Sequence, residues 1–114
     1  MSNPAKAKGT ALESAVRDFL KERGIPAYRP AQEGYKDTGD LHGVSPFIIQ
    51  AKNWRDLPAA LREGVDGANK QRVNAGERWG VAAIKRPRKG VADTYVVMDL
   101  ATFAEVLAEL RGTV

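Results

Sequence analysis

The chain has 114 residues, of which 43% are hydrophobic and 28% charged, and these values are typical of one globular domain. It has no cysteine and one histidine, which excludes disulfides, thiolate metal sites and a multi-histidine zinc site within one chain, so any metal should be a hard ion bound by oxygen. The net charge of +4 is uneven, because residues 97–114 carry −2 and the rest +6, and this basic bias favours a polyanionic partner.

The N-terminal segment is basic and lacks the apolar region of a signal peptide. No apolar run approaches the roughly 20 residues of a membrane helix. We therefore expect a cytoplasmic protein without a membrane partner. Residues 1–8 are predicted to form a flexible basic arm, followed by a single domain over residues 9–114.

The first helix is predicted to begin at Thr10 and to stop at Gly24. Thr10 and Glu13 match a capping box, in which the glutamate reaches back to the threonine amide. Apolar residues at helical spacing mark the buried face of this helix: Leu12, Val16, Phe19 and Leu20.

Three strands are predicted next. Residues 25–30 suggest a short edge strand, because their prolines would interrupt a central ladder. A polar loop over residues 31–39 leads to a second strand over residues 41–44. Residues 47–52 are almost continuously apolar, as expected of a central strand covered on both faces.

A second helix is predicted after Asp56 as N-cap, with Pro58 in its first turn. Gly64 and Gly67 weaken this helix by about 1 kcal/mol each, and they allow close packing on a sheet or a partner. The apolar face of the helix is formed by Leu57, Leu61, Val65 and Ala68.

Two further strands are predicted over residues 79–84 and 94–98, joined by a basic loop. A last helix follows Asp99 and ends at Gly112. Its apolar face comprises Leu100, Phe103, Leu107 and Leu110. The predicted order is α-β-β-β-α-β-β-α, which is an α/β fold.

Polar side chains occur on the most apolar strand. Side chains alternate along a strand, so Ile48, Gln50 and Lys52 share one face. Burying an amide or an ammonium group without a partner costs several kcal/mol, which indicates a polar site at this position. A tight hairpin between the second and third strands would bring Asp40 beside Gln50.

These residues resemble a known signature. Gly39-Asp40 followed by Gln50-Ala51-Lys52 is similar to the D…(E/Q)-x-K pattern of the restriction-endonuclease-like nucleases. Within them, the chain most resembles Holliday junction resolvases of the archaeal and phage type, through Lys8-Gly9 with Glu13 and through residues 81–85. The matching segments span nearly the whole chain. The resemblance implies a mixed β-sheet flanked by helices and a nuclease domain over residues 9–114.

The resemblance also implies a metal site. Asp40 would be the metal-binding carboxylate, Gln50 would ligate through its amide oxygen, and the carbonyl of Ala51 would be a backbone ligand. Glu13 would bind the metal directly or through water. Lys52 would orient the attacking water and stabilise charge on the phosphate. The implied cofactor is Mg²⁺, with Mn²⁺ as a substitute and without a small-molecule cofactor.

The implied function is metal-dependent hydrolysis of DNA at four-way junctions in the cytoplasm of a bacterium or a phage-infected host. Cutting two strands symmetrically implies a homodimer. Cations near the site are expected to contact DNA, although residues 85–89 alone would equally suit a solvated hairpin tip. The expected DNA-binding residues are Lys6, Lys8, Arg55, Arg62, Lys85, Arg86, Arg88 and Lys89.

Position 50 departs from the resolvase pattern, which has glutamate there. Glutamine keeps an oxygen ligand but lacks a charge worth at most about 4 kcal/mol at 4 Å. Glutamine occurs there in Mrr-type restriction nucleases. Two alternatives therefore stay open, a Mrr-like or general DNA nuclease of the same fold, and a DNA-binding protein with a weakened or inactive site.

Each site residue also has a structural interpretation. Glu13 could serve only as the capping-box glutamate, Asp40 as a turn residue, Gln50 as a hydrogen-bonded core amide, and Lys52 as a surface lysine at a strand end. Asp37 competes with Asp40 for the metal role, and the position of Asp40 directly before the strand favours Asp40.

Overall fold

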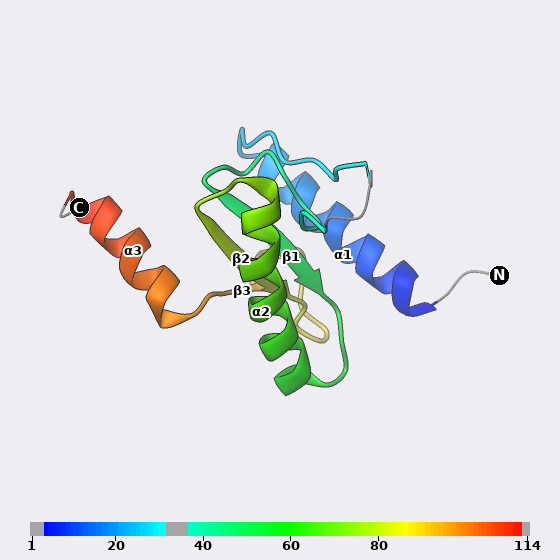
Figure 1. The fold of residues 1–114 in the computed structure, drawn as a ribbon. Coiled ribbons are helices and arrows are strands. Elements are labelled where there is room, and N and C mark those ends of the chain that lie inside the picture. Colours follow the sequence, from blue (N-terminus) through cyan, green and yellow to red (C-terminus); the bar gives the residue numbers. More distant parts are fainter. Residues whose placement is uncertain (1–3, 32–36, 113–114) are drawn as a thin grey trace.

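A small sheet lies between two long helices in the computed structural model, which describes residues 4–31 and 37–112 (Figure 1). β1 (Phe47–Lys52) runs parallel to β2 (Trp79–Ile84), and β3 (Tyr95–Val97) runs antiparallel to the other side of β2. The mixed sheet therefore has the order β1-β2-β3. The fold is α/β, as the sequence predicted.

The described residues form three α-helices and one short 3₁₀ helix. α1 packs against one face of the sheet and α2 against the other. The bounds of the helices are α1 Pro4–Lys21, α2 Leu57–Ala75, η1 Val91–Asp93 and α3 Leu100–Arg111. Within the part of the chain that is described, no helix has the length and apolarity to cross a membrane.

Two of the expected strands do not form. Residues 25–30 and 41–44 make only isolated bridges, from Tyr28 to His42 and from Leu41 to Ile49. Prolines in the first segment lack the N–H that a ladder requires. Gly43 has a φ of +76°, which interrupts an extended strand. The predicted order is therefore wrong at these two strands, and the described residues follow α-β-α-β-β-α.

The first helix begins at Pro4, so the start predicted at Thr10 is wrong. Proline suits the first turn of a helix, and the alanines and lysines of residues 5–8 are strong helix formers. Residues 4–8 of the expected flexible arm are therefore helical, and residues 1–3 lie outside the described residues. Because Thr10 is inside α1, the capping-box interpretation of Glu13 is also wrong.

The central strand is β2 and not β1, contrary to the expectation for residues 47–52. β2 has a neighbour on each side and is buried along its whole length. β1 pairs with β2 on one side, and its outer side meets Leu41 only through an isolated bridge. The outer edge of β1 therefore remains accessible to side chains from other segments.

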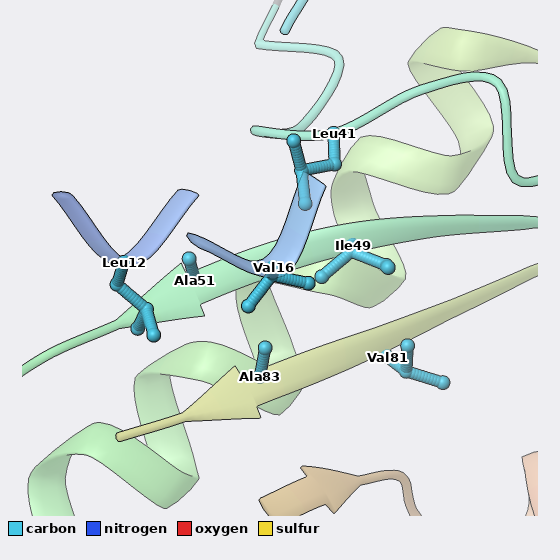
Figure 2. Packing of buried hydrophobic residues seen from close by; sticks show 7 residues of the cluster. All are labelled: Leu12, Val16, Leu41, Ile49, Ala51, Val81 and Ala83. Carbon is cyan, nitrogen blue, oxygen red and sulfur yellow. The ribbon is translucent and has the colours of Figure 1, made fainter. Parts of the chain in front are cut away.

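The larger apolar cluster lies between α1 and the sheet (Figure 2). α1 contributes Leu12 and Val16, which pack against alternate residues of β1 and β2. Leu41, from the segment before β1, closes one side of this cluster and is fully buried. The strand residues in the cluster are Ile49, Ala51, Val81 and Ala83.

Small residues bring α2 close to the other face of the sheet. Ala60 of α2 and Ala82 of β2 are fully buried there, and a Cβ added at Gly64 would lie 2.9 Å from the Cβ of Ala82. Gly64 therefore serves packing on the sheet. As predicted, α2 is capped by Asp56, which accepts a hydrogen bond from the Ala59 amide at 3.1 Å, and α3 is capped by Asp99.

We expect opposite effects from alanine at the two glycines of α2. Gly67→Ala should stabilise the protein by up to about 1 kcal/mol, because its added Cβ would meet nothing nearer than 3.9 Å. Gly64→Ala gains the same helix propensity but overpacks against Ala82, so it should be less stable than Gly67→Ala by about 1–3 kcal/mol. Urea unfolding of both variants measures the difference. Equal stabilities would contradict the close approach of α2.

Candidate functional site

Asp40 is fixed at the outer edge of β1. Its backbone N–H and that of Leu41 both donate to the Ile49 carbonyl at 3.0 Å. The Asp40 carboxylate accepts a hydrogen bond from the Ala51 amide at 2.8 Å. The N–H and C=O of one strand residue point to the same side, so the Ala51 carbonyl also faces this edge. Asp40 is thus not a freely solvated turn residue.

Asp37 anchors the segment that carries Asp40. The Gln71 amide donates to the Asp37 carboxylate at 2.6 Å, and the Asn74 amide donates to the Asp37 carbonyl at 2.9 Å. The other carboxylate oxygen of Asp37 accepts from the Gly39 amide at 3.0 Å. These contacts tie the segment to α2. Asp37 therefore positions Asp40, and both oxygen atoms of its carboxylate, which was considered as a metal ligand, already accept hydrogen bonds.

Sequence reasoning missed Gln71, although a signal for it exists. It lies at helical spacing from Gly64 and Ala68, on the face of α2 that packs on the sheet, and it is almost fully buried. A glutamine on a face of small buried residues requires a polar partner. That partner could not be identified before the fold placed Asp37 beside α2.

Glu13 of α1 comes close to Asp40. Both line a cavity of about 430 Å³, with Ala51 of β1 at its wall. Arg29 lies 3.7 Å from the Glu13 carboxylate and also lines the cavity, as does Lys6. The structure therefore brings together three of the residues that the resemblance assigned to the metal, from three separate segments of the chain.

The two carboxyl groups share a partly buried environment. Burial raises the pKa of Glu13, the negative charge of Asp40 raises it further, and Arg29 partly offsets both. Burial also raises the pKa of Asp40, against the Ala51 N–H bond, which lowers it. Asp37 raises the pKa of Asp40 and Lys52 lowers it. The direct interaction of the two side chains raises the pKa of Glu13 and lowers that of Asp40.

Gln50 and Lys52 leave β1 on the face that α2 covers. The Lys52 side chain runs beside Gly64, and its ammonium group lies 4.4 Å from the centre of the Trp54 ring. Gln50 is buried, and its Oε1 has no hydrogen-bond partner among the described residues. It is therefore not the fully hydrogen-bonded core amide that the structural interpretation requires. Neither residue lines the cavity of Glu13 and Asp40.

The expected DNA-binding cations divide into separate groups. Lys6 lines the acidic cavity, and Lys8 contacts Asn53 through its carbonyl. Arg62 and Arg88 are exposed. A second hollow of about 300 Å³ has an aromatic and basic lining that includes Trp54, Tyr95, Arg55, Lys85, Arg86 and Lys89.

Not all of these cations point freely into solvent. The Lys85 ammonium group donates hydrogen bonds to the carbonyls of Arg86 and Lys89, so it stabilises its own loop. Arg86 lies 4.6 Å from the centre of the Tyr95 ring. His42 is similarly engaged, with its Nε2 at 2.6 Å from the Thr38 carbonyl.

The donor set at the cavity suits a hard divalent cation. Glu13 and Asp40 supply carboxylate oxygens, and the Ala51 carbonyl adds a neutral oxygen. Across residues 4–31 and 37–112, no three acidic, histidine or cysteine side chains are grouped so that they could hold a metal. The pair would therefore need backbone, amide or water oxygens to complete a coordination shell.

Comparison with known proteins adds no family to this description. No protein-family model matches the sequence, and no curated protein or solved structure matches it.

We expect Glu13→Gln to raise the melting temperature at pH 7.5. A carboxyl group whose pKa is raised by folding stabilises the protein below its ordinary value of 4.5 and loses that contribution as the pH rises through the folded pKa. Glutamine mimics the protonated form, so the variant should gain a few degrees at pH 7.5, where about 1 kcal/mol corresponds to roughly 4 °C. The gain should disappear near pH 4.

Thermal melts between pH 4 and pH 8 measure this difference. Glu63→Gln removes an exposed glutamate from α2 and is the matched control, for which no such gain is expected. A Glu13→Gln variant that is less stable than the wild type at pH 7.5 would mean that the contact with Arg29 outweighs the burial of Glu13 and the repulsion from Asp40.

Proposed function

We propose that this protein is a divalent-metal-dependent DNA endonuclease with a restriction-endonuclease-like core. The observation that carries the proposal is the partly buried pair of Glu13 and Asp40 beside the backbone of Ala51, in a cavity that also contains basic residues. Two acids held together against their mutual repulsion are typical of a site that binds a cation.

Mg²⁺ would be held by Asp40, Glu13 and the Ala51 carbonyl, with Mn²⁺ as a substitute. When bound, the metal supplies a Lewis acid for the phosphate and a water of lowered pKa. Asp40 is held for this role by the Ala51 amide on one side and by the anchoring of Asp37 on the other. A bound cation would lower the raised pKa of Glu13, because it would offset the repulsion from Asp40.

Lys52 is proposed to orient the attacking water and to stabilise charge on the phosphate. Its ammonium group is near enough to Asp40 to lower the pKa of that carboxyl group, which supports a place beside the site. Its present contact is with the Trp54 ring. In the proposed complex with DNA, the long Lys52 side chain would swing from the Trp54 ring to the phosphate.

The proposed substrate is branched DNA, with the four-way junction as the leading candidate and a homodimer as the acting form. Lys6 and Arg29 at the cavity could bind the phosphate next to the cleaved bond. The aromatic and basic hollow around Trp54 and Tyr95 could bind a second stretch of backbone or an unpaired base. A branched substrate could occupy both sites at once, with the cleaved strand at the cavity and another strand or an unpaired base at the hollow.

One observation favours a second candidate, a DNA-binding protein with a weakened or inactive site. The group at position 50 is an amide and not a carboxylate, and its side chain lies on the α2 face of β1. The candidate shares the fold and the DNA surface of the first but lacks the charge needed to hold the metal firmly. Cleavage assays separate the two.

We expect cleavage of a four-way junction in Mg²⁺ or Mn²⁺ and at least a hundredfold loss in Asp40→Asn, which corresponds to about 2.7 kcal/mol of transition-state stabilisation. Lys52→Ala should lose a similar factor while both variants keep their DNA affinity. Asp66→Asn, an exposed acid of α2, is the matched control and should cut normally. Gel assays on labelled junction, duplex and single-stranded DNA measure rate and affinity together.

Each outcome of this assay selects one function. Paired symmetric nicks confined to the junction support a resolvase, and equal cleavage of linear duplex supports a Mrr-like or general nuclease. Tight DNA binding without cleavage in either metal supports the binding protein. Full activity in Asp40→Asn would overturn the proposed site.

We expect Gln50→Glu to tighten Mn²⁺ binding by about tenfold, because a third carboxylate adds a negative charge. The gain should stay below the roughly 4 kcal/mol of a charge at 4 Å, because position 50 lies outside the cavity, on the α2 face of β1. Without metal, the variant should be less stable than the wild type, because the new charge is buried. Calorimetric titration with Mn²⁺ and thermal melts in EDTA measure the two effects. A destabilised variant with unchanged Mn²⁺ affinity would mean that position 50 faces away from the metal.

A further inference from the structure

The last helix exposes the side chains that should be buried. Leu100 and Leu110 are each 79% exposed, and Phe103 and Leu107 are 48% and 41% exposed. All four lie on one face of α3. In Figure 1, α3 projects away from the sheet and from the other helices. Four large apolar side chains gathered on one exposed helix face indicate an interaction surface.

The opposite, polar face of α3 contacts the protein's own chain. Glu105 accepts a hydrogen bond from the Trp79 indole at 3.4 Å, and Glu109 lies 3.4 Å from Arg78. The Asp99 cap accepts a hydrogen bond from Asn69 of α2 at 2.9 Å. Two residues, 98 and 99, separate β3 from α3. These contacts hold the helix with its apolar face directed outward.

The same chain has an apolar groove on the sheet. α1 covers only part of its face of the sheet, and the remaining part forms a hollow of about 740 Å³. Its lining is almost wholly apolar and includes Leu20, Ile25, Phe47, Ile49, Val81 and Met98. Val96 at its margin is 62% exposed. Such a groove on a sheet face is the usual place for a helix.

We propose that α3 of one protomer docks its apolar face into this groove of a second copy, and that the second copy returns the contact. Each chain carries both the helix and the groove, which is the condition for a self-complementary two-fold interface. A segment that leaves its own domain through a short connection and packs on an identical domain is an exchanged element.

Size and charge support a second copy as the occupant. The apolar stripe from Leu100 to Leu110 is about 15 Å long at 1.5 Å per residue. The two-fold arrangement forms the contact twice, so each partner buries both its helix and its groove. Both areas contribute to the roughly 800 Å² per partner that a stable interface needs. The acids of α3 and of its cap are engaged by their own chain, so the docking stripe carries no charge. This matches the groove, whose lining also has no charged residue. The inference does not depend on the proposed nuclease activity.

Cysteine cross-linking tests the exchange directly, because the chain has no cysteine of its own. Leu107→Cys places a thiol on α3 and Ile25→Cys places one in the groove, both at exposed positions. Mixing the two single variants and oxidising them mildly should give a disulfide-linked dimer of one chain of each kind. The matched control mixes Leu107→Cys with Glu63→Cys, an exposed position on α2, and should give little disulfide-linked dimer.

Other occupants give different products. Dimers formed mainly by Leu107→Cys alone would mean that two α3 helices pair with each other. An intrachain disulfide in the double variant at high dilution would mean that α3 folds back into its own groove. Either product would overturn the exchange.

Sedimentation velocity provides a second measurement. We expect the wild type to be a dimer at tens of micromolar. In Leu107→Glu and in Ile25→Glu, the dissociation constant of the dimer should rise at least tenfold. An equimolar mixture of the two variants should recover part of the dimer, because one helix and one groove remain intact. Circular dichroism checks that each variant is folded. A monomeric wild type would overturn the proposal.

Discussion

The hydrogen bond from the Ala51 amide to the Asp40 carboxylate is the contact on which the candidate site depends. β1 is an edge strand on this side, so its outward amide must find a partner or water. Asp40 provides that partner and is fixed by it within reach of Glu13. A strand edge is usually protected by a charged side chain, and here the same charge also forms half of an acid pair. The protection of the edge and the assembly of the site are therefore one interaction.

The pair is maintained by contacts that come from both faces of the sheet. Leu12 and Val16 pack α1 against β1 and thereby fix the position of Glu13 beside Asp40. On the other face, Gln71 holds Asp37, and this contact determines where the chain turns toward Asp40. Neither helix alone places both acids. The repulsion between the carboxyl groups is thus opposed by the packing of the whole α/β sandwich, which is how a fold can hold a site that is unfavourable in isolation.

The sequence predicted the elements that have strong periodicity. Its predictions were wrong where long-range contacts decide whether a strand forms. The strands at residues 47–52 and 79–84 and the caps Asp56 and Asp99 follow from local rules, and they are correct. The strands expected at residues 25–30 and 41–44 depend on a pairing partner, and the prolines and Gly43 reduce them to single bridges. The resemblance named Glu13 and Asp40, which the structure brings together, but not Gln71, because the partner of a buried amide is visible only after folding.

Residue 50 shows how strand phase limits an argument from pattern. Alternation correctly placed Gln50 and Lys52 on one face of β1, and the same alternation turns Ala51 toward the α1 side. Asp40 comes from the segment before β1 and joins the strand through the Ala51 amide. The oxygen atoms at the cavity therefore come from the strand edge and from α1. The amide of Gln50 lies on the α2 side of β1, and its Oε1 has no hydrogen-bond partner among the described residues. A buried oxygen without a partner costs stability, so its persistence has to be repaid by a ligand, a water or a rearrangement of β1.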